Sequence, residues 1–333
     1  MIGYDPLMFF FLGCDPGSAL VPGDRPGNPR DSAADSATDT APEVDGLACG
    51  DNLALGTHEE CDGTDDSACP GACSAHCQCP SMPATGELSI HVMDVWQGDG
   101  VLVVSPDGFT MLVDAGDEDD YWGIKEHFRD EGIAGLDYTL VSHQHADHMG
   151  AMDWALEDHP EVGLAFDGGG RADTTAFSDY RAMAADKRST VRVGDLLDMG
   201  PSMAVEVLHA DIGDRENENN NSVVIRITHG EVTALLGGDC ESEVCESSFD
   251  PGPIDLYKVH HHGSVDSSAP WFLEEMSPAV ALISCGEGND YGHPDGPTLN
   301  RLDAAGAEVW RTDEAGHIVA RSDGSNYAIT GSR

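Results

Sequence analysis

The stretch Ser142-His143-Gln144-His145-Ala146-Asp147-His148-Met149-Gly150 decides the fold. It directly follows the apolar run 138–141, so it is expected to form the turn between a strand and a helix. On such a turn, His143 and His145 are expected to face one ion. Asp147 and His148 are expected to face a second, and imidazole together with carboxylate suits zinc, manganese or iron. The stretch therefore predicts a metal centre with room for two ions.

Outward from this turn, residues 86–333 alternate apolar and polar side chains as half-buried strands do. We expect strands at 88–92, 101–104, 111–113, 138–141, 204–208, 223–228, 232–236, 254–259 and 279–284, and near 309, 318 and 327. Helices are expected at 122–129, 147–156, 175–187, 271–275 and 298–305. Strand-rich and helix-rich stretches occur in two successive halves, which indicates two packed sheets with helices outside.

The sequence resembles the metallo-β-lactamase-fold superfamily, whose HxHxDH motif matches 143–148 letter for letter. The resemblance covers most of 86–333 and is closest to the hydrolase domain of ComEC-type competence proteins and its secreted relatives. It rests also on HVMDVWQGDGVLVV (91–104), MLVDAGD (111–117), VHHHGS (259–264) and DYGHPDG (290–296). It implies a metal-dependent hydrolase with a four-layer αββα fold, in which two mixed β-sheets are flanked by helices.

The resemblance also implies two divalent metal ions, zinc or manganese, bridged by Asp239. We expect His262 to close the second site and His261 to contact the substrate, and the exchanged roles remain open. Most of the superfamily has another His just before the strand that here begins at Ser222, but this chain has Asn219-Asn220-Asn221 there. His209 is then a candidate ligand, although a structural role at a strand end is the alternative. If His209 is not a ligand, water or the neighbouring Asn219 would complete the first site. A site with so few protein ligands would favour a hard, exchangeable ion such as manganese.

Further residues receive roles around this centre. Asp114 is expected to orient a ligand imidazole or the bridging water, although a strand-end Asp can also simply cap a turn. His293 is interpreted as a phosphate contact or general acid that acts with Asp147 and His261, with an ordinary loop histidine as the alternative. Lys258 and Ser264 are expected to contact an anionic substrate, unless the lysine only packs its stem at a strand end.

The N-terminal 85 residues differ in composition from the rest. Residues 1–14 end in Phe11-Leu12-Gly13-Cys14, which resembles a bacterial lipobox, so Cys14 would carry lipid and anchor the protein in the outer membrane. Residues 15–47 are acidic and rich in Pro, Gly, Ser and Thr, as in a disordered linker.

Residues 48–80 hold an even set of cysteines, which predicts a small disulfide-rich module of an exported protein: Cys49, Cys61, Cys69, Cys73, Cys77 and Cys79. Zinc binding by these cysteines is the alternative. Cys240 and Cys245 are so close in sequence that a disulfide between them would need distorted geometry, and Cys285 is expected to be a buried free thiol.

The charge limits what the protein binds. In the full chain, 16 basic and 61 acidic residues give a net charge of −45, which excludes an ordinary nucleic-acid binder with its basic face. The resemblance implies a phosphodiesterase or nuclease, and the charge adds that it works in salt and forms no stable nucleic-acid complex at low salt. We expect the protein to be an extracytoplasmic monomer. Its substrate would be a phosphodiester-containing small molecule or nucleic acid. The alternatives are a lactonase, β-lactamase or other ester hydrolase, and a non-catalytic surface binder.

Overall fold

The computed structural model describes residues 61, 68–69 and 72–333. The predicted lipobox with Cys14, the linker 15–47 and Cys49 lie outside the described residues. None of the helices in the described part has the length and apolar character needed to span a bilayer.

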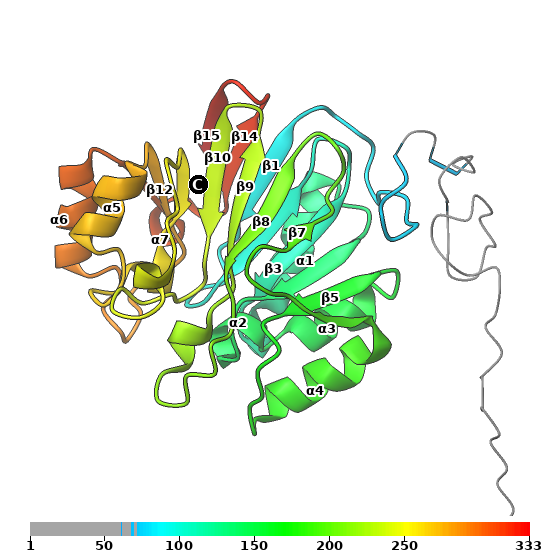
Figure 1. The fold of residues 1–333 in the computed structure, drawn as a ribbon, viewed down its shortest axis with the longest axis horizontal. Coiled ribbons are helices and arrows are strands. Elements are labelled where there is room, and N and C mark those ends of the chain that lie inside the picture. The colour runs from blue at the N-terminus through cyan, green and yellow to red at the C-terminus, as the bar shows by residue number, and fades with distance from the viewer. Residues whose placement is uncertain (1–60, 62–67, 70–71) are drawn as a thin grey trace, which may run out of the picture. The chain divides into compact units, whose positions relative to one another are not determined.

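The described domain contains two β-sheets (Figure 1). The eight-stranded sheet has the order β15-β14-β1-β2-β3-β4-β5-β6 and comprises β1 (Leu88–Val92), β2 (Gly100–Val104), β3 (Thr110–Ala115), β4 (Tyr138–Val141), β5 (Leu164–Asp167), β6 (Arg188–Thr190), β14 (Ile318–Ser322) and β15 (Tyr327–Gly331). The seven-stranded sheet has the order β13-β12-β11-β10-β9-β8-β7 and comprises β7 (Leu196–Leu197), β8 (Ala204–His209), β9 (Val224–His229), β10 (Val232–Leu236), β11 (Leu256–Lys258), β12 (Val280–Ile283) and β13 (Glu308–Arg311). Both sheets mix parallel and antiparallel pairs.

Helices cover the outer face of each sheet. They are α1 (Tyr121–Glu131), α2 (Ala146–Met149), α3 (Met152–Asp158), α4 (Thr175–Ala184), α5 (Pro270–Met276), α6 (Gly296–Ala305) and α7 (Thr312–Ala315). Side chains from α1, α3 and α4 pack on the first sheet, and those from α5 and α6 pack on the second. The predicted αββα layering is therefore confirmed.

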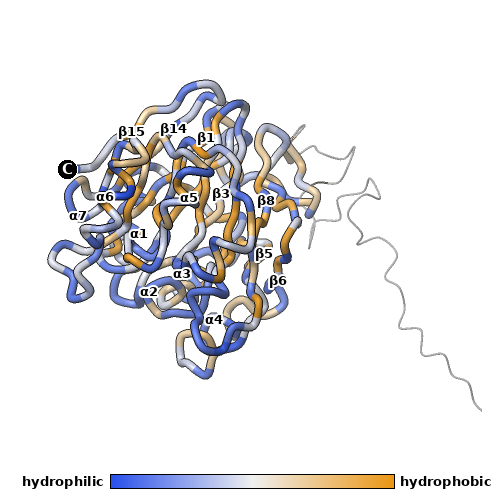
Figure 2. Tube along the Cα trace, turned by 60° about the vertical axis from the view of Figure 1, so that its left-hand side comes forward, coloured by the Kyte–Doolittle hydropathy of each residue, from blue (hydrophilic) through white to orange (hydrophobic). Residues whose placement is uncertain are grey.

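The core between the sheets follows from the alternation of the strands. In β1, Ile90 and Val92 enter the cluster shared with Val205, Ile225 and other side chains of the second sheet. The intervening His91 points to the opposite face and contacts His127 of α1. Figure 2 shows the hydrophobic stretches gathered on the strands, while most connecting loops are hydrophilic. Burial on both faces fixes the register that brings the strand ends together.

Two predictions of secondary structure need correction. The helix expected at 147–156 is two helices, α2 and α3, separated by Gly150 and Ala151, because the backbone leaves the helical conformation at Ala151 (φ −101°, ψ 8°). The helix expected at 175–187 ends at Ala184, and a short 3-10 turn leads from it into β6. Strands β5, β6 and β7 were not expected, because they are short and lack a clear alternation.

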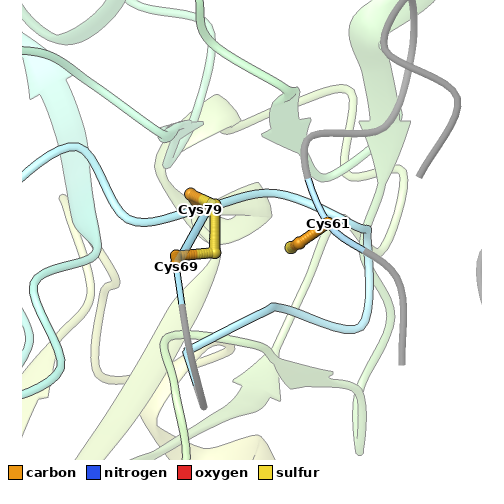
Figure 3. A group of neighbouring side chains, drawn as sticks. All are labelled: Cys61, Cys69 and Cys79. Atoms are coloured by element: carbon orange, nitrogen blue, oxygen red, sulfur yellow. A yellow bond between two sulfur atoms is a disulfide. The ribbon is translucent and has the colours of Figure 1, made fainter. Parts of the chain in front are cut away.

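The cysteines of the N-terminal module that the structure describes form disulfides. Cys69 is bonded to Cys79, next to Cys61 (Figure 3), and Cys61 is bonded to Cys73. Cys77 is also disulfide-bonded. These thiols are therefore not zinc ligands, and the disulfide interpretation of the module is confirmed.

Two more cysteines correct the sequence-based prediction. Cys240 and Cys245 are joined, with their Cα atoms 5.3 Å apart. The reason is that residues 240–245 form a compact turn in which ordinary disulfide spacing is reached over five residues. Cys285 is a buried free thiol, as predicted.

Candidate metal centre

The predicted metal ligands come from four segments that meet where strands of both sheets end. His143 and His145 follow β4, whereas Asp147 and His148 begin α2. From the second sheet, Asp239 follows β10, and the run 260–262 follows the parallel neighbour β11. Parallel strands point their carboxyl ends to the same edge, so residues far apart in sequence converge there.

One group of ligand atoms comprises Asp147, His148, Asp239 and His262, all within 4.8 Å of one another. Asp239 Oδ1 lies 3.1 Å from His148 Nε2 and 3.4 Å from His262 Nε2. Asp147 Oδ2 lies 3.5 Å from His262 Nε2. Tetrahedral zinc with bonds of about 2.1 Å separates its ligand atoms by about 3.4 Å. The spacing therefore fits one divalent ion, and we refer to these four residues as the second site.

His143, His145 and Asp239 form another group of ligand atoms. We call these three residues the first site, because their histidines come earlier in the sequence than those of the second site. His143 Nε2 lies 3.0 Å from His145 Nδ1 and 4.0 Å from Asp239 Oδ2. Asp239 thus offers Oδ1 to one group and Oδ2 to the other, as a carboxylate that bridges two ions must.

The burial and charges of the cluster fit divalent cations. Within the described residues, the ring nitrogens His148 Nε2 and His262 Nε2 and the oxygen Asp239 Oδ1 are buried without a hydrogen-bond partner. Burial opposes charge on these groups, but Asp239 raises the pKa of His262 to about 9, and His148 holds the pKa of Asp239 well below its usual range. Buried nitrogen and oxygen atoms that have no hydrogen-bond partner need an explanation, and binding of a metal ion by these atoms supplies it.

Asp114 lies where an orienting residue must lie. Its Oδ2 is 2.9 Å from His148 Nδ1, on the ring edge opposite the ligand nitrogen. Ser142 holds the carboxylate by donating its backbone N–H to Oδ1 over 2.7 Å and its hydroxyl to Oδ2 over 2.6 Å. Such a carboxylate fixes the tautomer and direction of the ligand imidazole.

Asp99 supports the second site from behind and was missed by the sequence analysis. Its Oδ1 lies 3.3 Å from His262 Nδ1, and its backbone N–H donates to the carbonyl of Asp147. The preceding Gly98 has φ +146°, and a Cβ there would lie 2.2 Å from the Asp147 carbonyl oxygen. The WQGDG stretch signalled this loop, because only glycine allows it to pack so closely on the HxHxDH turn.

The prediction that Lys258 contacts the substrate is wrong. Its side chain is buried in β11, and Nζ lies 2.7 Å from Asp99 Oδ1 and 2.8 Å from Asp99 Oδ2. Lys258 therefore neutralises Asp99 inside the protein. Ser264 is also buried: its hydroxyl accepts the N–H of Asp266, so it stabilises the turn and does not face a substrate.

The assignment of His209 as a ligand is also wrong. His209 is buried at the end of β8, and its Nδ1 lies 2.7 Å from the carbonyl oxygen of Ser222 and 3.5 Å from Cys245 Sγ. It belongs to neither ligand group. The histidine holds the start of the segment leading into β9, which is the structural alternative.

Asn219, His261 and Glu241 lie beside the first site. Asn219 Nδ2 donates to Glu241 Oε1 over 2.8 Å and lies 3.5 Å from His261 Nε2. His261 Nε2 is 3.6 Å from Asp239 Oδ2. Glu241 was not singled out from the sequence, because a glutamate two residues after a predicted ligand carries no motif.

His293 lies on the loop before α6, near both histidines of the 261–262 pair. Its ring centroid is 5.5 Å from that of His261 and 6.3 Å from that of His262. Asn289 fixes the backbone of His293, because its Oδ1 accepts the N–H and its Nδ2 donates to the carbonyl. Tyr291, which is largely exposed, stacks on the outer side of the ring.

The αββα layers and a carboxylate shared by two ligand groups define a class of metal-dependent enzymes. Consistent with this, the model of the metallo-beta-lactamase superfamily matches residues 93–287. The chain belongs to this superfamily, and it is a metal-dependent hydrolase of that fold.

The chain is similar in sequence to several curated bacterial proteins. The chain is 28% identical to ComE operon protein 3 of Bacillus subtilis, over 73% of this chain and 34% of that protein. It is 30% identical to competence protein ComA of Neisseria gonorrhoeae, over 72% of this chain and 33% of that protein. Recombination protein 2 of Haemophilus influenzae is 28% identical, over 69% and 28% respectively. The chain thus spans about a third of the length of the curated relatives it matches.

Proposed function

We propose that the protein is a phosphodiesterase or nuclease that uses two zinc or manganese ions. The observation that carries the proposal is the position of Asp239, which gives one oxygen to each ligand group. When bound, two such ions generate a nucleophile from water at neutral pH and stabilise the attacking and leaving oxygens of an in-line displacement. Similarity to competence and recombination proteins supports a phosphodiester of nucleic acid as the substrate class.

The protein's own groups divide the work around this centre. Asp239 would hold both ions, while Asp114 orients the imidazole of His148 and the carbonyl oxygen of Ser284, 3.1 Å from His262 Nδ1, orients that of His262. Asp99 Oδ1 lies 3.3 Å from the same nitrogen. Burial, together with His262 and His261, lowers the pKa of His293. A neutral imidazole there donates an N–H to a phosphate oxygen, so the contact role is favoured over that of general acid near pH 7.

The acidic chain shapes how such a substrate is met. Residues 86–333 carry 14 basic and 47 acidic side chains, a net charge of −33. Repulsion of a polyanion extends over about 10 Å at 0.1 M salt but only about 3 Å at 1 M. We therefore expect the rate on single-stranded DNA to rise with salt, and the rate on the small substrate bis-p-nitrophenyl phosphate to change little.

The test is turnover of both substrates with added manganese or zinc at low and high salt. Asp147→Asn should abolish turnover, and Asp186→Asn, at an exposed position after α4, should leave it unchanged. Nitrocefin and a lactone serve as alternative substrates. Cleavage of either of these, with both phosphodiesters untouched under all conditions, would show that the enzyme belongs to the ester and amide hydrolases.

We also propose that the protein acts outside the cytoplasm as a monomer anchored through lipid on Cys14. The disulfides support an oxidising compartment, since such bonds are rare in the cytosol. Cells fed a labelled fatty acid should incorporate it into the wild type and not into Cys14→Ser. Equal labelling of both proteins contradicts the anchor, and a mass above one chain by light scattering contradicts the monomer.

A further inference from the structure

The first site has fewer protein ligands than the second. The second site gathers two histidines and two carboxylates, whereas the first gathers His143, His145 and one oxygen of Asp239. The segment Asn219–Asn221, which lies beside the first site, contains no histidine. Three protein ligands leave a position open for water, as in catalytic zinc sites, and a first site that matched the four protein ligands of the second would need one more group on its open side.

His261 lies on that side. Its Nε2 is 3.6 Å from Asp239 Oδ2, which is the oxygen that faces His143 and not the one that faces His262. This separation is close to the ligand-to-ligand distance of about 3.4 Å in a tetrahedral zinc site. His261 lies outside the group of His143, His145 and Asp239, whose ligand atoms are all within 4.8 Å of one another, so its ring must move toward them to bind the ion. The contact of 3.5 Å between His261 Nε2 and Asn219 Nδ2 is at the limit of a hydrogen bond, so it does not occupy the nitrogen.

The opposite edge of the His261 ring faces a carboxylate. Nδ1 lies 3.4 Å from Glu241 Oε1. Glu241 is itself held by two amides, since Asn219 Nδ2 donates to Oε1 over 2.8 Å and Asn217 Nδ2 donates to Oε2 over 2.6 Å. Histidines that bind metal usually present their other ring nitrogen to such a fixed carboxylate, as His148 does to Asp114.

The backbone accounts for the divergence of two adjacent histidines. His261 (φ 51°, ψ 45°) and His262 (φ 53°, ψ 21°) are both left-handed, a conformation that residues other than glycine rarely adopt. The turn is fixed by the His261 N–H, which donates to the carbonyl of Gly238, and by the Ser264 N–H, which donates to the carbonyl of His261. Strained residues of this kind concentrate at functional sites. Here the strain directs one ring to Oδ2 and the next to Oδ1 of Asp239.

We propose that His261 Nε2 is the fourth protein ligand of the first metal ion and that Glu241 orients it through Nδ1. The Asn217–Asn219 segment then supports the first site indirectly, by holding Glu241. This inference rests on the two-metal centre of the proposed function, but it changes His261 from a substrate contact to a metal ligand.

The test is metal binding, measured by titrating the metal-free full chain with cobalt(II), whose visible spectrum reports coordination, and with zinc by calorimetry. The wild type should bind two ions. His261→Gly suits the left-handed backbone, and it should keep one ion near wild-type affinity and weaken the other at least 100-fold. Glu241→Gln should weaken the same ion about 10- to 100-fold. Glu243→Gln, at an exposed neighbour, should bind as the wild type does.

The outcomes separate this inference from the proposed function. If His261→Gly binds both ions with wild-type affinity and has unchanged circular dichroism, His261 is not a metal ligand. If the same variant also loses phosphodiester turnover, His261 is instead a substrate contact. Two ions in the wild type and one in His261→Gly, without phosphodiester turnover by any form, would keep the ligand and overturn the proposed function. A wild type that binds fewer than two ions overturns both.

Discussion

Replacing Lys258 with methionine tests whether its side chain contacts the substrate or neutralises Asp99 inside the protein. As a substrate contact, Lys258→Met would raise KM and leave stability unchanged. In the structure the side chain is buried and pairs with Asp99 at 2.7 Å. Removing one partner of a buried ion pair leaves an uncompensated charge and costs about 3–5 kcal/mol. In a domain of this size that corresponds to a fall in Tm of about 6–20 °C.

The surface pair Lys125–Asp158 supplies a matched control. Its atoms are 2.6 Å apart, but the side chains are 38% and 37% exposed. Such a pair contributes about 0.2–1 kcal/mol, so Lys125→Met should change the free energy of unfolding little. Both variants are compared by urea unfolding in EDTA, which removes differences in metal content from the measurement.

A double-mutant cycle completes this experiment. Lys258→Met, Asp99→Asn and the double variant should show a coupling of about 2–3 kcal/mol, because the double variant removes both buried charges. Additive losses, or a stable Lys258→Met whose only defect is a higher KM, would refute the buried pair. Because Asp99 Oδ1 also faces His262 Nδ1, the single variants should in addition bind the second-site ion more weakly.

Three further predictions concern regions around the centre. Burial, and then His127, lower the pKa of His91 from 6.5 to about 3. The unfolded chain therefore binds a proton at His91 below pH 6.5 while the folded chain does not, so the free energy of unfolding falls as the pH falls from 6.5 toward 3. Between pH 7.5 and 5.5 this amounts to about 1.4 kcal/mol, which His91→Gln should remove from the pH dependence of urea unfolding. Asp114→Asn should weaken cobalt(II) binding about 10- to 100-fold at the second site, whereas unchanged binding would contradict its contact with His148. Cys240→Ser with Cys245→Ser should lower Tm, because the closed turn that follows Asp239 is freed; an equal Tm would contradict this.

The sequence predicted the parts of the structure that depend on local pattern. Alternation located the main strands, and the spacing in 143–148 placed two ligands toward each site. Prediction from the sequence failed for side chains whose role depends on residues far away in the chain. Lys258 and Asp99 are 159 residues apart and meet only because β11 lies deep in the second sheet, next to the loop after β1. His209 was a candidate ligand because it is the nearest histidine upstream of Asn219-Asn220-Asn221, yet its ring turns toward Ser222 and the disulfide at Cys245.

The run His260–His262 shows why residue type alone did not assign the roles of its members. The three rings do not form one cluster, since each faces a different carboxylate of the segment Asp239–Glu246: His262 faces Asp239, His261 faces Glu241 as well as Asp239, and His260 faces Glu246. The buried pair of His260 and Glu246, at 2.9 Å, anchors one end of the turn, so that the next two rings are free to diverge. The disulfide Cys240–Cys245 closes the segment that carries the carboxylates. The geometry of the metal centre is therefore set by two short segments that oppose each other.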